Sequence, residues 1–138
     1  MSKVVLLVVV DTNFMTIPAQ FNVDIFAEAE RLLERRFEFV ILPSVASEIE
    51  TGARDSEGGS DKVAFRIAKD LVNRCRTVEI EESFSDLPVD DQLLEYAVQV
   101  QGLLATNDRE LRNRARERGV PVLFLRGRKR LKVEGTLA

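Results

Sequence analysis

Four carboxylates in this sequence each stand where a strand or a turn is expected to pass into a helix. They are Asp11, Glu48, Asp91 and Asp108. No histidine is present among the 138 residues. Carboxylates without imidazole or thiolate partners are hard oxygen ligands, which suit Mg²⁺ or Mn²⁺ better than zinc. The four acids therefore indicate metal-dependent chemistry on phosphate esters.

Each acid also has a purely structural interpretation. Asp108 and Asp90 stand where an N-cap carboxylate would accept a backbone N–H bond. Glu48 falls inside an expected helix, where Glu is a good helix former. Asp11 is harder to explain in this way because it follows seven consecutive apolar residues, the pattern of a buried strand. It should lie at the carboxyl edge of a sheet, where ligands bind in α/β folds.

The apolar pattern predicts the elements that must position these acids. Strands are expected at 3–10, 39–42, 77–80, 103–105 and 122–125, and helices at 23–36, 44–51, 63–75, 89–101 and 108–118. Gly52 is the expected stop of the second helix, and the polar residues 53–61 form an expected mobile loop that could overhang a site. This order predicts an α/β fold with three layers and a central parallel sheet of five strands. In the strand order 3-2-1-4-5, Asp11 and Asp108 would follow neighbouring strands.

Length and composition bound the class of protein. The 138 residues match one domain, and the longest apolar run is too short to cross a membrane. That run also lacks the flanking residues of a signal peptide. With a single cysteine, Cys75, the chain cannot form an internal disulfide, and we expect this side chain to pack in the core. We expect a cytoplasmic protein.

Charge is unevenly distributed along the chain. Residues 1–108 have a net charge of −10, whereas 109–138 have a net charge of +7. The candidate RNA-binding cations are Arg109, Arg112, Arg126, Arg128, Lys129 and Arg130, the last four in a basic C-terminal segment, 126–138. Such a surface attracts a polyanion, although a solvated helix face and a basic tail would look the same.

Taken in order, four motifs resemble those of the PIN-domain ribonucleases over essentially the whole chain. They are VVVDTNF, VASEIE, DDQLLEYA and ATNDRELR. The resemblance is closer to the PIN proteins that cleave precursor ribosomal RNA, and to their archaeal relatives, than to the toxin ribonucleases. It implies that Asp11, Glu48, Asp91 and Asp108 bind metal, with Glu50 and Asp90 as the open alternatives to their neighbours.

The resemblance also implies a role for polar residues beside the acids. Asn13 and Thr106 would orient a metal-bound water or the phosphate, and Asn107 is a weaker candidate. It further implies the sheet order 3-2-1-4-5, homodimerisation, and RNA cleavage with Mg²⁺ or Mn²⁺ that leaves a 5′-phosphate and a 3′-hydroxyl.

We therefore expect a metal-dependent endoribonuclease, with ribosomal RNA processing as one setting. The alternatives are a toxin-type PIN ribonuclease controlled by an antitoxin and a non-catalytic RNA-binding module within a ribosome-assembly particle. A phospho-signalling receiver is disfavoured because no Asp comes immediately after the expected third strand and the expected fifth strand contains no Lys. Neither a dinucleotide-binding glycine motif nor a P-loop occurs.

Overall fold

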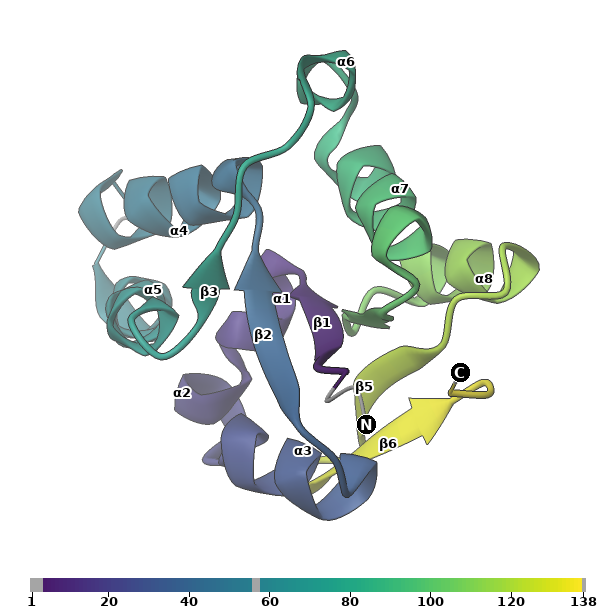
Figure 1. The fold of residues 1–138 in the computed structure, drawn as a ribbon. Helices are drawn as coiled ribbons and strands as arrows, with labels where there is room; N and C mark the ends of the chain where they lie inside the picture. The colour runs from purple at the N-terminus through teal and green to yellow at the C-terminus, as the bar shows by residue number, and fades with distance from the viewer. Residues whose placement is uncertain (1–3, 56–57, 138) are drawn as a thin grey trace.

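A six-stranded sheet forms the centre of the computed structural model, which describes residues 4–55 and 58–137 (Figure 1). Its order is β3-β2-β1-β4-β5-β6. The strands are β1 (Leu6–Val10), β2 (Phe37–Ile41), β3 (Arg76–Thr77), β4 (Leu103–Ala105), β5 (Val122–Arg126) and β6 (Arg130–Glu134). Pairing is parallel throughout except between β5 and β6. The expected fold and the order of the first five strands are confirmed.

The C-terminal segment, for which a basic tail was one interpretation of the sequence, instead contains a sixth strand. β6 runs antiparallel to β5 from the pairing of Arg126 with Arg130 to that of Val122 with Glu134. Leu131 and Val133 alternate with charged residues, so the apolar side chains turn to one face of the strand, and Leu131 is fully buried. The basic residues therefore sit on a hairpin of defined geometry.

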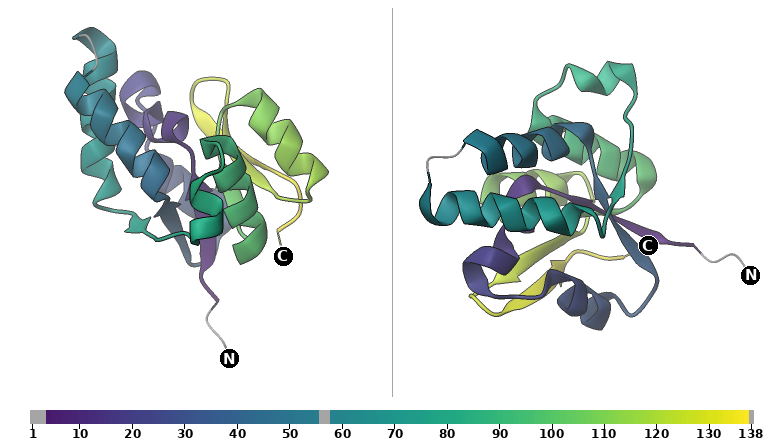
Figure 2. Two further views of the ribbon diagram at one scale, coloured as in Figure 1. Left: turned by 90° about the horizontal axis from the view of Figure 1, so that it is seen from above. Right: turned by 90° about the vertical axis from the view of Figure 1, so that its left-hand side faces the viewer.

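Helices cover both faces of the sheet. They are α1 (Thr12–Met15), α2 (Ile17–Phe21), α3 (Ile25–Leu33), α4 (Pro43–Asp55), α5 (Gly59–Val72), α6 (Glu82–Ser85), α7 (Val89–Val100) and α8 (Arg109–Glu117). Helices α2, α4 and α5 lie on one side and α7 and α8 on the other (Figures 1 and 2). Val8, Val9 and Val10 are fully buried between these layers, as a continuous apolar strand requires.

Gly52 does not end its helix, contrary to the expectation, and α4 continues to Asp55. A Cβ at position 52 would lie 2.4 Å from Cγ of Phe65, so the glycine serves the close approach of α5 to α4. Of the residues 53–61 that were expected to form a loop, 53–55 belong to α4 and 59–61 to α5, and 56–57 lie outside the described residues.

Other boundaries differ by a few residues. The helix expected at 23–36 is α3, which starts after the N-cap Asp24 and is preceded by two short helices that the apolar pattern did not predict. The third strand is only Arg76–Thr77, rather than 77–80. No described helix is long and apolar enough to cross a membrane.

Candidate active site

Asp11 lies at the carboxyl end of β1, beside the end of β4. Its backbone N–H donates to the carbonyl oxygen of Ala105 at 2.9 Å, which continues the pairing of the two strands. The side chain is 7% exposed. Its carboxylate accepts hydrogen bonds from the Thr12 backbone N–H at 2.7 Å, from Asn13 Nδ2 at 3.0 Å and from Thr106 Oγ1 at 2.8 Å. The orientation of this carboxylate is thus fixed by the protein.

Thr106 connects the first acid to the last. Its side chain is fully buried, and Oγ1 donates to Asp11 while accepting from the Asp108 backbone N–H at 3.1 Å. Asp108 caps α8, as expected, because its Oδ1 accepts from the backbone N–H groups of Glu110 at 2.9 Å and Leu111 at 3.3 Å. Within the described part of the chain, no hydrogen bond reaches Asp108 Oδ2. The N-cap role of this residue therefore leaves one carboxylate oxygen for a ligand.

Glu48 reaches the same place from α4. Its Oε1 accepts a hydrogen bond from Thr12 Oγ1 at 2.6 Å. Glu50, the alternative left open by the sequence, instead forms an ion pair of 3.0 Å with Lys69 on α5. The structure therefore brings Glu48, and not Glu50, toward Asp11.

The adjacent acids Asp90 and Asp91 in the first turn of α7 point to different surroundings. Asp91 forms an ion pair with Arg114 on α8, and Asp90 lines the cleft that also contains Asp11, Glu48 and Asp108. Asp90 is not the helix cap that was considered from the sequence, because α7 begins after Pro88 without a side-chain cap. The position expected for Asp91 in the acidic cluster is thus held by Asp90.

The cleft has a volume of about 450 Å³ and lies beyond the carboxyl ends of β1 and β4. Its lining includes the acids Asp11, Glu48, Asp61, Asp90 and Asp108 together with Thr12, Asn13, Thr16 and Gln20. Among its described lining residues there is no Lys or Arg. Asp61, at the start of α5, is the acid that the sequence did not single out, since it fell in the expected loop.

Burial and mutual repulsion disfavour full ionisation of this cluster. Burial is the main cause that raises the pKa of Asp11, against the hydrogen bonds from Thr106 and Thr12, and the charges of Asp90 and Glu48 raise it further. The pKa of Asp90 is raised by burial first and then by the charge of Asp108. A bound cation would remove this repulsion and restore the ionised forms.

The donor set fits a hard divalent cation by its chemistry, since it consists of oxygen atoms with uncompensated negative charge. In the part of the chain that the structure describes, no group of three or more Asp, Glu or Cys side chains is arranged so that it could hold a metal ion as it stands. Rotation of the side chains toward one another would therefore have to accompany binding.

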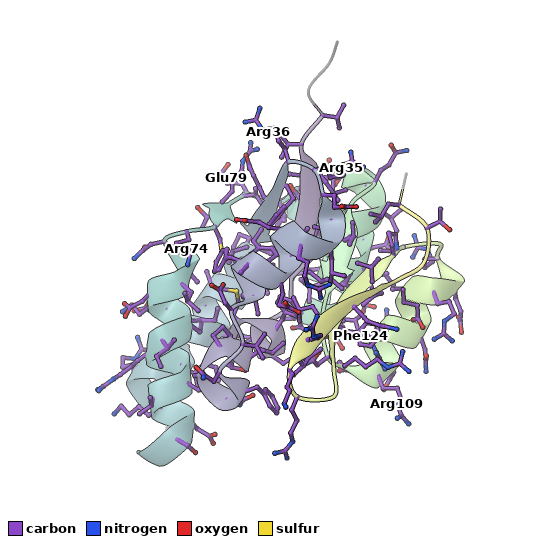
Figure 3. All side chains as sticks on the ribbon, turned by 90° about the horizontal axis from the view of Figure 1, so that it is seen from below. Arg35, Arg36, Arg74, Glu79, Arg109 and Phe124 are labelled. Carbon is purple, nitrogen blue, oxygen red and sulfur yellow. The ribbon has the colours of Figure 1, made fainter. Side chains whose placement is uncertain are left out.

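The β5–β6 hairpin, which carries four of the candidate RNA-binding cations, turns at the carboxyl end of β5 and therefore at the same end of the sheet as the cleft. The β5–β6 turn, α1 and the adjoining ends of α4 and α5 point to the side opposite the N-terminus (Figure 2), and Arg109 lies near that turn (Figure 3). Arg126, Arg128, Lys129 and Arg130 are exposed. The guanidinium of Arg112 lies 4.2 Å from the ring centroid of Phe124, and its buried Nε has no hydrogen-bond partner among the described residues.

The other arginines of α8 and of its C-cap are already paired. Arg114 pairs with Asp91, Arg116 with Glu134 and Arg118 with Glu95. Arg109, Arg112 and the hairpin cations form no ion pair among the residues described, so they keep their charge available for an external anion.

Asn13 and Asn107 join the acids to the root of the basic hairpin. Asn13 Oδ1 accepts from the Asn107 backbone N–H at 3.0 Å while its Nδ2 donates to Asp11. Asn107 Oδ1 in turn accepts from the Leu125 backbone N–H at 2.8 Å, directly before Arg126. Asn107 thus contacts β5 rather than facing the cleft. No sequence pattern predicts this contact.

Comparisons with known proteins give a family match and named relatives. Residues 8–128 match the family model described as a PIN like domain. The chain is 30% identical over 131 residues to ribonuclease VapC4 of Methanocaldococcus jannaschii, covering 93% of this chain and 96% of that protein. It is 35% identical over 126 residues to ribonuclease VapC9 of Archaeoglobus fulgidus, covering 91% and 87%.

Solved structures also match the fold of this chain. The structure described as the PIN domain endonuclease Utp24 matches with a TM-score of 0.75 and 28% identity, covering 95% of this chain and 92% of that one. A PilT N-terminus domain protein from Sulfolobus solfataricus shares the fold, with a TM-score of 0.53 and 16% identity over 86% and 87% of the two chains.

Proposed function

Since this chain belongs to the PIN-like domain family, we propose that it is an endoribonuclease that needs Mg²⁺ or Mn²⁺ to hydrolyse RNA phosphodiester bonds. The observation that carries the proposal is the convergence of Asp11, Glu48, Asp90 and Asp108, from four separate elements, on one cleft. The relatives named ribonucleases and the likeness to a PIN domain endonuclease support RNA as the substrate and internal cleavage as the reaction.

Four of the five cleft acids, Asp11, Glu48, Asp90 and Asp108, would hold the ion or ions, whereas Asp91 pairs with Arg114. A bound divalent ion supplies positive charge for the scissile phosphate and lowers the pKa of a water molecule, so no protein nucleophile is needed. Thr106 and Asn13 hold Asp11 in one orientation, and Thr12 does the same for Glu48. These contacts reduce the ordering that metal binding would otherwise require.

No cysteine nucleophile competes with this chemistry. Cys75, the single cysteine of the chain, lies next to β3, away from the cleft lining. Burial raises the pKa of its thiol to about 11, so the thiol is protonated at neutral pH. The acids are therefore the groups on which the proposed reaction depends.

Arg109, Arg112 and the hairpin cations Arg126, Arg128, Lys129 and Arg130 would position phosphates of the RNA rather than read its bases. Their charge offsets the repulsion between RNA and the acids. Stacking against Phe124 limits the motion of the Arg112 guanidinium. The RNA would then lie across the carboxyl edge of the sheet, with the hairpin on one side of the cleft.

Two cellular roles fit this activity about equally. The sequence motifs favour an RNA-processing enzyme that works with a ribosome-assembly factor, and the likeness to the PIN domain endonuclease Utp24 is compatible with that role. The relatives named VapC favour a toxin-type ribonuclease that an antitoxin restrains. In either role, we propose that the protein acts as a homodimer.

Cleavage of single-stranded and structured RNA, with Mg²⁺, with Mn²⁺ and with chelator, tests the activity. We expect internal cleavage with metal, none with chelator, and loss of cleavage in Asp11→Asn and Asp108→Asn. Equal cleavage by the parent and both variants would refute the assignment of the acids. Metal-independent RNA binding without cleavage by the parent would instead favour the non-catalytic module.

A further inference from the structure

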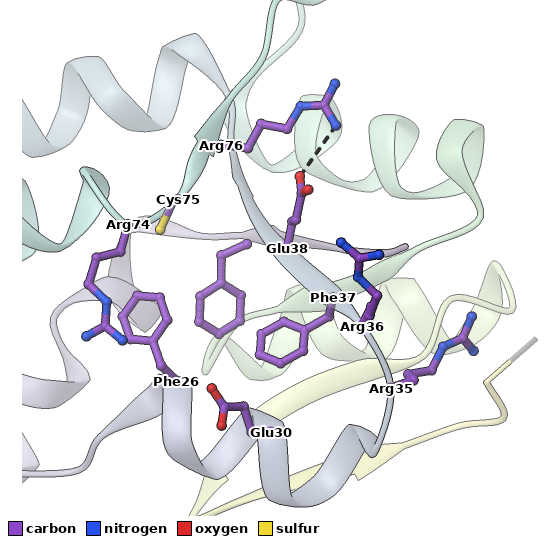
Figure 4. A pocket seen from close by; sticks show the side chains of 10 residues that line it. Phe26, Glu30, Arg35, Arg36, Phe37, Glu38, Arg74, Cys75 and Arg76 are labelled. Atoms are coloured by element: carbon purple, nitrogen blue, oxygen red, sulfur yellow. Dashed lines mark hydrogen bonds and ion pairs between the residues drawn. The ribbon is translucent and has the colours of Figure 1, made fainter. Parts of the chain in front are cut away.

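A second hollow, of about 680 Å³, lies at the amino ends of the strands, away from the acidic cleft (Figure 4). We call it the edge groove. It is lined by Phe26, Glu30, Arg35, Arg36, Phe37, Glu38, Phe39, Arg74, Cys75 and Arg76. Arg35 and Arg36 lie at the opposite end of the molecule from Arg109 (Figure 3). The proposed nuclease activity makes no use of this groove.

The groove follows a stretch of β2 whose outer edge is open. On its inner side, β2 pairs with β1 along Phe37–Val40. On its outer side, it pairs with β3 only at Val40 and Ile41. Within the described part of the chain, no strand therefore covers the outer edge at Phe37–Phe39. An uncovered strand edge offers backbone donors and acceptors to an extended peptide.

Aromatic rings form the floor of the groove. The ring centroids of Phe26 and Phe39 are 5.0 Å apart, and those of Phe37 and Phe39 are 5.4 Å apart. The guanidinium of Arg74 lies 3.8 Å from the ring centroid of Phe26. Phe37 is half-buried, so part of its ring remains free for an apolar side chain.

The rim carries an excess of positive charge. Four arginines and two glutamates line the groove. One of these glutamates, Glu38, is paired with Arg76 at 3.4 Å, and this pair is exposed. Among the described residues, the side chain of Arg36 has neither a hydrogen bond nor an ion pair, while its backbone carbonyl accepts from the Leu6 N–H at 2.9 Å. The groove is thus complementary to a ligand that carries negative charge along an apolar core.

An extended polypeptide fits these features better than RNA does. Base stacking needs an open ring face, but Arg74 covers Phe26 and Phe39 is only 2% exposed. The open edge of β2, in contrast, presents backbone N–H and C=O groups at the spacing that a neighbouring peptide strand needs for pairing. We propose that the edge groove binds an extended acidic segment of a partner protein. That segment adds beside Phe37–Phe39, places an apolar side chain on Phe37 and directs carboxylates to Arg36 and Arg74.

The test selects a displayed library of short random peptides against the full chain, in chelator so that the nuclease site plays no part. We expect enriched peptides in which acidic and apolar residues alternate, since successive side chains of a strand face opposite sides. Their affinity should fall about tenfold in Arg36→Glu and less in Arg74→Gln. The matched control is Arg66→Glu, an exposed arginine of α5 outside the groove lining, which should bind the peptides like the parent.

A proline placed in the middle of an enriched peptide should abolish binding, because proline removes a backbone donor from the added strand. Unaltered melting temperatures would show that the variants are folded. Enriched peptides without acidic residues, or with equal affinity for the parent and Arg36→Glu, would overturn the proposal. So would a short single-stranded RNA whose binding is weakened by Arg36→Glu while peptide binding is not.

Discussion

The two ends of the sheet handle charge in opposite ways. At the carboxyl end, acids gather in a cleft and are oriented by Thr12, Asn13 and Thr106 before any cation binds. At the amino end, exposed arginines surround phenylalanine rings and an uncovered strand edge. Acids held close together repel one another, and a bound cation relieves that repulsion. Exposed arginines are screened by solvent, so their charges are tolerated without a bound ligand. The difference indicates a reaction site at one end, where Asp11 is already oriented and the other acids must still rotate to bind a cation, and a docking surface at the other.

The strongest test of this comparison substitutes the two adjacent acids of α7 one at a time. We expect Asp90→Asn to reduce kcat/KM for RNA cleavage by about a hundredfold, or about 3 kcal/mol of transition-state stabilisation, because a ligand of the proposed metal site is lost. Asp91→Asn should cost less than about tenfold, since Asp91 contacts Arg114 rather than the cleft. The measurement is initial cleavage rate at several RNA concentrations in saturating Mn²⁺. The reverse ranking would return the metal-binding role to Asp91.

The second largest effect should come from the threonine that links the acids. Thr106→Val keeps the side-chain shape, but removes a hydrogen bond to Asp11 and leaves the Asp108 N–H without its acceptor. We expect the metal concentration at half-maximal cleavage to rise about tenfold. The matched control is Thr77→Val on the exposed strand β3, which should leave the metal dependence as in the parent. An unchanged metal dependence in Thr106→Val would show that this network does not prepare the site.

The sequence predicted the fold because its signals are local. Long apolar runs mark buried strands, and Asp108 and Gly119 mark the limits of the basic helix. Asp11 was identified as a site residue because an acid that ends a buried strand has few structural explanations. Asp108 was recognised both as a cap and as a site residue, and the geometry allows both.

What the sequence missed depends on tertiary contacts. Successive residues of a helix point about 100° apart, so the choice between Asp90 and Asp91 depends on how α7 is rotated against α8, and the Arg114 contact reveals that rotation. The sequence suggested that Gly52 ends its helix. The structure shows that a glycine is needed there because the ring of Phe65 leaves no room for a Cβ. Asp61 lines the cleft from α5, and Asn107, a weaker candidate from the sequence, accepts a hydrogen bond from the Leu125 backbone instead of facing the cleft. Strand β6 forms because β5 offers it an edge.

The basic hairpin can be separated from the edge groove by salt dependence. In chelator, the double variant Arg126→Gln, Arg128→Gln should bind single-stranded RNA about tenfold more weakly. The slope of log affinity against log salt should fall by about 1.4, which corresponds to two lost phosphate contacts on a single strand. Arg36→Gln, in the groove, should leave both quantities unchanged. Equal effects of the two changes would mean that RNA extends over both ends of the molecule.

The smallest expected effect is on stability, and its sign distinguishes the acids of α7. Burial, and then repulsion by Asp108, raise the pKa of Asp90 above its ordinary value of 3.8 in the folded protein. Between that ordinary value and the raised one, the folded state binds more protons than the unfolded state. The free energy of unfolding therefore decreases as pH rises through this window, and the metal-free protein carries the full penalty at neutral pH.

Asp90→Asn should remove that penalty. Because Asp90 is partly exposed, we expect a gain of only about 0.5 kcal/mol, or about 2 °C in melting temperature, at pH 7 in chelator. Asp91→Asn loses an ion pair with Arg114 and should lower the melting temperature slightly. Added Mn²⁺ should stabilise the parent more than Asp90→Asn, since binding to the folded state raises its stability. A lower melting temperature of Asp90→Asn in chelator, with an undiminished response to Mn²⁺, would place Asp90 outside the acidic cluster.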